Sequence, residues 1–363
     1  MDGYDTPSSR LGDHLAVIPR LSPLVSLGGL PLSAHMLELL AGLPFLSELS
    51  LYHTPEEVIL GQVEYENRPN GVLSRFSRLK TMHIVALHNI YATICPILSH
   101  FPIDQLGSLT LELVESDKLP MPHTTHTIFT LLGNHARALH TFRLVVDAEK
   151  WDKSDPPLAI EGEAYAIAPW SSLSCLLSCH ELRSVSVRCA GAYHGCKLDT
   201  ERILQLGHAW PSLSELCITE TAISVGAIQR FSGRSVLGMV ELEVLSAVCP
   251  RLKVLKLTLD VKLGSAEDNE TGPVGSRKDS FPLDLSLGYS VLAKEDAVDV
   301  ARRLISFWPG LRSLRTDWKS HRNDPHKCYL SRWRQVIEHC GPSVEDAHDM
   351  KYYSGEKHFW RAS

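Results

Sequence analysis

One nine-residue phrase recurs four times along the chain. It reads LPFLSELSL at 43–51, WPSLSELCI at 210–218, CPRLKVLKL at 249–257 and WPGLRSLRT at 308–316. Each copy places a proline after an apolar residue and then spaces its apolar residues as Leu-x-x-Leu. The same spacing recurs without the proline at 78–84, 105–111, 138–144 and 181–187. Self-similarity of this kind is typical of repeat proteins.

The first leucines of the eight copies define the repeat. They are Leu46, Leu79, Leu106, Leu139, Leu182, Leu213, Leu252 and Leu311, and successive gaps are 33, 27, 33, 43, 31, 39 and 59 residues. The alternating leucines at 283, 285 and 287 split the long last gap into 31 and 28 residues. The chain therefore has room for a ninth unit.

Between the copies the apolar period changes from two to 3.6, as in Ile94, Ile97, Leu98 and Phe101 and in Val298, Ala301, Leu304, Ile305 and Trp308. Each unit thus reads as a helix followed by a short strand. Proline fits the junction because it cannot continue a helix. Since one such unit cannot cover its own apolar faces, stacked neighbours must do so. The fold class predicted is α/β: an irregular solenoid, or horseshoe, with a parallel sheet on its concave face and helices on its convex face. A doubly wound sheet is the alternative, but no Gly-rich phosphate loop follows a strand.

The phrase resembles the leucine-rich-repeat region of fungal F-box-type proteins, and the resemblance runs from about Leu21 to Trp318. It implies a substrate-recognition module of a ubiquitin-ligase adaptor, with ubiquitin-ligase subunits among its partners. An F-box opens with Leu-Pro-x-Glu, and residues 1–45 contain no such start. A standalone leucine-rich-repeat scaffold outside ubiquitin chemistry is therefore the alternative.

The resemblance is imperfect within the repeats too. Regular leucine-rich repeats carry an Asn or Cys three residues after the last strand leucine. Here those positions hold Thr54, Leu87, Val114, Asp147, Ala190, Thr221, Asp260 and Lys319. No asparagine ladder can form, so we expect an irregular solenoid.

The expected organisation has three parts: a flexible N-terminus at 1–20, the solenoid at 21–318 and a capping segment at 319–363 with a helix around Tyr329 to His339. Gly61 to Gly71, Asp147 to Pro169 and Gly264 to Ser280 interrupt the repeat. The last is polar and Gly-rich, which predicts a disordered insertion.

The composition restricts the classes of protein to which the chain can belong. The chain has 363 residues, 44% of them hydrophobic, and a formal charge of -6 from 36 basic and 42 acidic residues. No basic footprint indicates a nucleic-acid partner, and no apolar run is long enough to cross a membrane. The first 20 residues do not resemble a signal peptide, and nine cysteines form no regular framework. We expect a cytoplasmic or nuclear protein.

Two patterns could carry chemistry. Cys175, Cys179 and His180, followed by Cys189, His194 and Cys196, could make a tetrahedral zinc site, but small buried cysteines are the simpler interpretation. The 18 histidines accompany no catalytic motif. We therefore expect neither an enzyme nor a cofactor, and we expect Trp210 and Trp308 to pack in the core.

Functional residues are expected on the concave face, at strand positions that the core does not need. Between the second and third strand leucines these are Ser50, His83, Thr110, Arg143, Ser186, Cys217, Lys256 and Arg315. One step further along come Tyr52, Glu112, Arg188, Thr219 and Asp317. This row becomes more basic toward the C-terminus. We expect Arg143, Arg188, Lys256 and Arg315 to contact an acidic segment of a protein partner.

Overall fold

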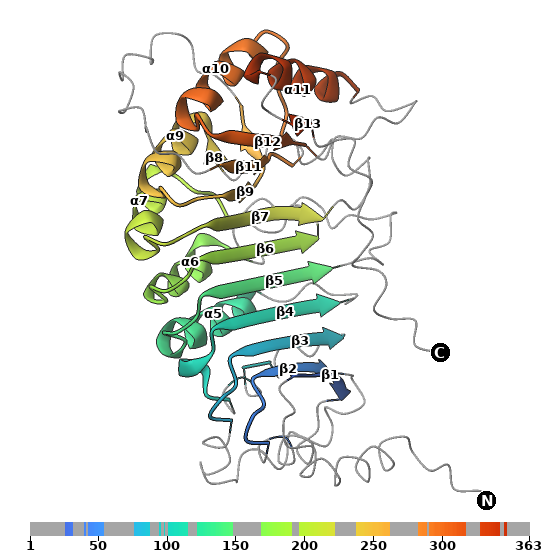
Figure 1. Ribbon diagram of the computed structural model, residues 1–363, viewed down its shortest axis with the longest axis vertical. Helices are drawn as coiled ribbons and strands as arrows, with labels where there is room; N and C mark the ends of the chain where they lie inside the picture. The colour runs from blue at the N-terminus through green and yellow to red at the C-terminus, as the bar shows by residue number, and fades with distance from the viewer. Residues whose placement is uncertain are drawn as a thin grey trace, which may run out of the picture. The chain divides into compact units, whose positions relative to one another are not determined.

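A computed structural model describes most of the repeat region (Figure 1). The described residues are 26–31, 40, 43–53, 76–87, 94–95, 98, 101–114, 122–147, 168–190, 196–221, 237–261, 282–288, 290–316, 327–341 and 345–346. The expected flexible N-terminus, the insertion at 264–280 and the Gly61 to Gly71 segment lie outside them, as does most of 147–169.

The chain divides into two compact units. The first comprises residues 1–197, 208–213 and 220–227, and the second comprises 198–207, 214–219 and 228–363. Each unit combines a parallel sheet with helices, so the α/β class is confirmed.

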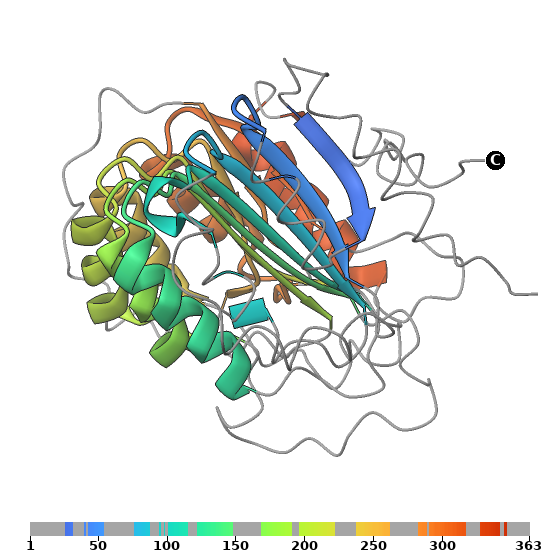
Figure 2. The same cartoon turned by 90° about the horizontal axis from the view of Figure 1, so that it is seen from below.

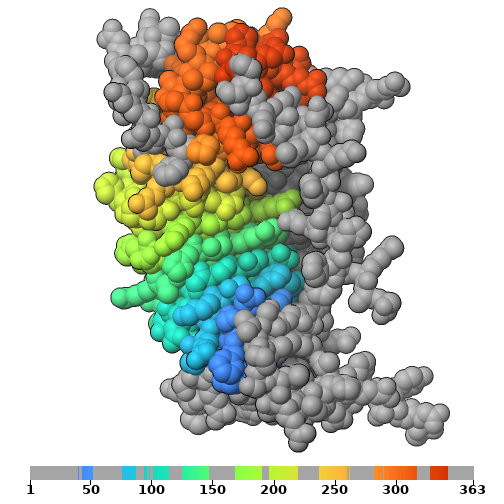
Figure 3. All heavy atoms as spheres, viewed as in Figure 1, coloured from blue at the N-terminus to red at the C-terminus, as the bar shows by residue number. Residues whose placement is uncertain are grey.

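The strands of the first unit pair in chain order. They are β1 (Ser26–Pro31), β2 (Glu48–His53), β3 (Thr81–Leu87), β4 (Ser108–Val114), β5 (Thr141–Asp147) and β6 (Ser184–Ala190), and all neighbouring pairs are parallel. Figure 3 shows β2 to β6 as successive bands of colour. The helices are η5 (Ile103–Gln105), α5 (Pro122–His135), α6 (Trp170–Leu173) and η7 (Ser174–Ser178). Helix α5 lies to one side of these strands (Figure 2).

The second unit follows the same rule. Its main strands, in spatial order, are β7 (Glu215–Thr221), β9 (Val254–Lys256), β11 (Leu283–Ser286), β12 (Leu311–Arg315) and β13 (Glu345–Asp346). Strands β8 (Leu237–Gly238) and β10 (Leu259–Asp260) form a separate parallel pair. The helices are α7 (Thr200–Ala209), α9 (Met239–Val248), α10 (Ala297–Phe307) and α11 (Lys327–Cys340). The strand order reverses in neither unit, whereas a doubly wound sheet reverses at its switch point.

All eight repeat leucines occupy the same structural position. The backbone N–H of each donates to the carbonyl oxygen three residues earlier and closes a turn before the strand. The acceptors are Leu43, Phe76, Ile103, Ala136, Cys179, Trp210, Cys249 and Trp308. Where the phrase has a proline, it is the second residue of this turn, which its fixed φ suits. The ninth strand, β11, begins at Leu283 as predicted.

A backbone ladder connects successive turns within each unit. The carbonyl oxygen of Ser47 accepts the N–H groups of Lys80 and Thr81 at 2.8 and 2.9 Å. Lys80, Gly107, His140 and Ser214 each repeat this double acceptance from the next turn. These bonds join neighbouring repeats through backbone groups alone, at the start of their strands.

The core of the first unit consists of two rows of buried strand residues. In each row the residues are register partners on β2 to β6 and lie side by side. One row contains Leu49, Met82, Leu109, Phe142 and Val185, and the other contains Leu51, Ile84, Leu111, Leu144 and Val187. From α5, Phe129 meets Phe142 edge to face at 5.3 Å. Because strand side chains alternate between faces, the residues between the buried ones point away from the helices.

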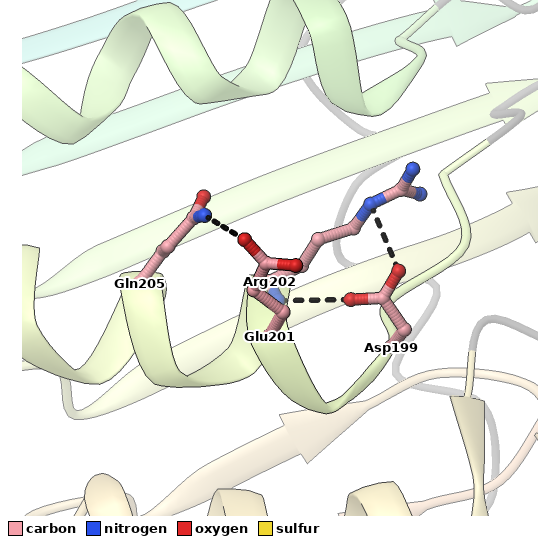
Figure 4. A network of polar contacts seen from close by, with 4 residues as sticks. All are labelled: Asp199, Glu201, Arg202 and Gln205. Atoms are coloured by element: carbon pink, nitrogen blue, oxygen red, sulfur yellow. Dashed lines mark hydrogen bonds and ion pairs between the residues drawn. The ribbon is translucent and has the colours of Figure 1, made fainter.

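A side-chain cap fixes the start of helix α7 in the second unit. Asp199 precedes α7, and its Oδ1 accepts the backbone N–H of Arg202 at 2.9 Å, while Oδ2 lies 3.3 Å from Arg202 Nε (Figure 4). Glu201 accepts a bond from Gln205 one turn along. An aspartate at this position satisfies a donor that the first helical turn leaves unpaired.

The C-terminal helix expected from the sequence is present, and the buried face of α10 differs from the expected one. Helix α11 covers the predicted 329–339 segment, and its buried Trp333 donates from Nε1 to the carbonyl oxygen of Ser290 at 2.9 Å. The prediction that Val298 belongs to the buried face of α10 is wrong, because its side chain is 41% exposed. Val300, two residues later, is the buried valine of this helix.

Candidate functional site

A row of polar side chains crosses the first unit on the side opposite its core. Ser50, His83, Thr110, Arg143 and Ser186 are direct register partners on β2 to β6. We call these five residues the first-unit row. All five are partly exposed. The structure thus brings together five of the residues that the sequence singled out.

The next row is less polar than expected. Tyr52, Val85, Glu112, Val145 and Arg188 are register partners on the same strands. Val85 is buried, so Glu112 and Arg188 are separated from Tyr52 by apolar positions that the sequence interpretation had left out. Tyr52 lies on β2, and the structure does not describe its side chain. Asp317 lies outside the described residues, and Thr219 is partly exposed on β7.

His83 has a polar neighbour on each of the two adjacent strands. Its Nδ1 lies 3.3 Å from the Ser50 hydroxyl, and its Nε2 lies 3.5 Å from Glu112 Oε1. The second distance is at the outer limit of hydrogen bonding, and the buried Nε2 has no other partner among the described residues. Ser50, His83 and Glu112 therefore form a continuous chain of contacts across β2, β3 and β4.

The charge of Glu112 is favoured by its neighbours. The His83 side chain lowers the pKa of this carboxyl below its usual value, the positive charge of Arg143 acts in the same direction, and burial opposes both. Glu112 therefore remains a carboxylate, and it offsets part of the Arg143 charge.

A serine, an imidazole and a carboxylate in contact could activate the serine hydroxyl as a nucleophile. Acyl transfer also needs donors placed around the developing oxyanion. Ser50 lies within a strand whose backbone groups pair with its neighbours, so the N–H groups beside it serve the sheet. The three side chains are better described as a fixed polar surface.

The second unit has its own row. Lys256 pairs in register with Ser286, and Ser286 pairs with Arg315. Cys217 on β7 pairs with Lys256 and completes the second-unit row. Cys217 is only 4% exposed, and its thiol donates to Glu215 Oε1 at 3.4 Å. It is therefore a poor contact residue, although the sequence placed it among the candidates.

Two sets of residues on this face were missed. Ser286 follows a leucine run that lacks the repeat phrase, so its place between Lys256 and Arg315 was not recognised. A further polar row precedes the first-unit row: Glu48, Thr81, Ser108, Thr141 and Ser184. Counting two residues back from the first-unit row, by the period of a strand, would have found it.

Three of the four cysteines in the candidate zinc pattern lie in the interior. Cys179, Cys189 and Cys196 are buried, and burial raises the pKa of the Cys179 thiol to about 11. His194 lies outside the described residues. Within the part of the chain that the structure describes, no three His, Cys, Asp or Glu side chains cluster as metal ligands would.

Both repeat tryptophans lie in the core. Trp210 is fully buried and donates from Nε1 to the carbonyl oxygen of Leu176 at 3.2 Å, and Trp308 is 2% exposed. Their expected packing role is confirmed.

Comparisons with known proteins add little. No family model matches the chain, and no curated protein matches it. Among solved structures, a leucine-rich-repeat protein of Leptospira interrogans aligns over 88% of each chain at 13% identity, with a TM-score of 0.21. A TM-score this low does not indicate a shared fold, so the architecture rests on the strand order and register of this chain. None of the described helices is both long and apolar enough to span a membrane.

Proposed function

We propose that the chain is a non-catalytic protein–protein interaction module that binds its partner on the polar face of its sheet. The supporting observation is the first-unit row, in which five side chains outside the core stand in direct register on neighbouring strands. Side chains that the fold does not need are available for recognition.

The alternation along these strands supports the proposal. Parallel sheets are usually covered on both faces, and their strands then read as continuous apolar runs. Here buried residues alternate with hydroxyls, an imidazole and charged groups. An extended surface of mixed chemistry suits a macromolecular partner better than a small ligand, which prefers a concave apolar pocket.

At the level of architecture, we propose an irregular leucine-rich-repeat-like solenoid with this sheet on its concave face. Two cellular roles are proposed for this module. The first is the substrate-recognition part of an F-box-type ubiquitin-ligase adaptor, which the hydrophobic-Pro-x-Leu phrase favours. The second is a scaffold outside ubiquitin chemistry. Both would act in the cytoplasm or nucleus.

Affinity capture from the producing cells tests the binding face. Thr110→Arg and Ser186→Arg each place a bulky cation in the first-unit row, and Asn134→Arg places the same group on the exposed surface of α5. We expect the two row variants to lose the captured partner and the α5 variant to retain it. Thermal unfolding shows that all three variants are folded. Equal capture by all three would contradict the proposal.

The same experiment separates the two pathways. Cullin-type ligase subunits in the wild-type capture would favour the adaptor. A reproducible partner without such subunits would favour the scaffold.

A further inference from the structure

Three residues of the second-unit row place two cations around one hydroxyl. Lys256, Ser286 and Arg315 occupy equivalent register positions on β9, β11 and β12. Neighbouring strands lie about 4.8 Å apart, so the two basic residues start roughly 10 Å apart with Ser286 midway. All three point away from the core, because Leu255, Leu285 and Leu314 beside them are buried.

The two cations are not compensated within the described structure. Lys256 and Arg315 are exposed, and neither side chain forms an ion pair or hydrogen bond there. Two other arginines of the same unit are paired: Arg302 with Asp299 at 2.7 Å and Arg202 with Asp199 at 3.3 Å.

Two carboxylates near the cations in register are engaged by other groups. Asp284 precedes Ser286 by two residues on the same face, and its Oδ1 accepts the hydroxyl of Ser313 at 2.7 Å. Glu215 accepts the thiol of Cys217 at 3.4 Å. Neither lies within 4.0 Å of the two cations, so neither of these two carboxylates forms an ion pair with Lys256 or Arg315.

We propose that Lys256, Ser286 and Arg315 bind an extended acidic segment of the partner protein, with carboxylates on alternate residues facing the two cations. The inference rests on the proposed function and narrows it: the anion site lies in the second-unit row, and Arg143 of the first unit, already neighboured by Glu112, does not belong to it.

The geometry selects this ligand. Alternate side chains of an extended peptide project to one side about 6.8 Å apart. The backbones of Lys256 and Arg315 are further apart than this, but their long side chains can lean inward to reach two such carboxylates. A segment crossing β9, β11 and β12 would present one carboxylate to each cation. The Arg315 guanidinium can hold its carboxylate through two parallel bonds, and the Ser286 hydroxyl can donate between them.

The test uses the full chain and labelled peptides in fluorescence anisotropy. The first peptide alternates Thr and Glu. The second has the same composition with all Glu in one block, and the third replaces each Glu of the first by Gln. We expect the alternating peptide to bind several-fold more tightly than the block peptide, and the Gln peptide not to saturate. Affinity falls with added salt because the contacts are exposed.

Variants assign the binding to the three residues. Lys256→Gln and Arg315→Gln each weaken binding of the alternating peptide by roughly fivefold, the scale of one exposed charge contact. Ser286→Ala weakens it by roughly twofold. Arg302→Gln removes the same charge from α10 and leaves the affinity unchanged. Thermal unfolding verifies that each variant is folded.

A fourth peptide carries phosphoserine in place of each Glu of the first. Three results would overturn the inference: equal binding of the alternating and block peptides, an Arg302→Gln loss as large as that of Lys256→Gln, or binding of the phosphoserine peptide alone. The last would identify a phosphorylated segment as the ligand instead. If the acidic peptide does not bind while Thr110→Arg still abolishes partner capture, this site is wrong and the proposed function stands.

Discussion

His83 and Glu112 face each other across β3 and β4, with 3.5 Å between the imidazole Nε2 and the carboxylate Oε1. The two residues belong to adjacent rows of the polar face and join them. Because the Ser50 hydroxyl contacts the other ring nitrogen, the imidazole is held from both sides. These side chains are therefore already ordered before a partner binds. Less side-chain conformational entropy is then lost on binding.

The pair predicts a pH-dependent contribution to stability. Since the folded-state pKa of Glu112 is lowered, its contribution is present above the unfolded pKa and lost as pH falls through the folded pKa. Both side chains are about one-third exposed, so solvent screening limits the effect to roughly 0.5 kcal/mol. Urea unfolding of wild type and Glu112→Gln should differ near neutral pH and converge in acid. A difference that persists below the titration of this carboxyl would contradict the assignment, and Glu48→Gln on β2 is the control.

Replacing Gly133 of α5 by alanine should destabilise the protein, although alanine normally favours a helix. Alanine normally stabilises a helix interior by about 1 kcal/mol over glycine. Here a Cβ would collide with the carbonyl group of Cys175, whose carbon would be 2.9 Å away. We expect Gly133→Ala to lower the free energy of unfolding by about 2 kcal/mol, because overpacking outweighs the helix gain. The neighbouring Asn134→Ala should be neutral or slightly stabilising. Calorimetry checks both, and a higher Tm for Gly133→Ala would show that α5 does not pack on η7 as described.

The buried hydroxyl of Ser290 should contribute measurably to the stability of the second unit. This buried hydroxyl accepts the backbone N–H of Leu259 at 2.7 Å. Ser290→Ala leaves that donor unsatisfied, which costs about 1–3 kcal/mol. Ser306→Ala on α10 removes an exposed hydroxyl bonded to its own helix and should cost far less. Denaturant unfolding compares the two, and equal losses would count against the buried bond.

Loss of the helix cap that Asp199 provides should lower the stability of the protein. Asp199→Ala removes the acceptor for the Arg202 N–H at the start of α7 and should destabilise the protein by about 1 kcal/mol. Asp299→Ala breaks only an exposed pair with Arg302, for which roughly 0.5 kcal/mol or less is expected. Thermal unfolding distinguishes them. If Asp299→Ala costs more, the capping assignment is wrong.

The repeat could be predicted from sequence because its signal is local. Each repeat leucine closes a turn within four residues, and seven of the eight strands then begin two residues later. The backbone ladder was not predictable, since bonds such as Lys80 N–H to Ser47 O leave no trace in residue identity.

The polar face could be predicted in part. Leu-x-Leu alternation places Ser50 or Arg143 outside the core whatever their neighbours are. Register across strands is non-local, so the pairing of Ser286 with both Lys256 and Arg315 required the structure. The burial of Cys217 has the same origin, because alternation gives the direction of a side chain and not what covers it. Val298 shows the corresponding limit for helices: a short apolar pattern does not decide which of two nearby valines faces inward.

Site-specific photo-crosslinking in the producing cells tests the central claim most directly. A benzoylphenylalanine replaces Thr110 or Ser186 in the first-unit row, or Asn134 on α5, and mass spectrometry identifies the crosslinked peptide. The binding proposal predicts one common partner at positions 110 and 186 and none at 134. Crosslinks to that partner from position 134 alone would show that it binds the helical side and would contradict the account.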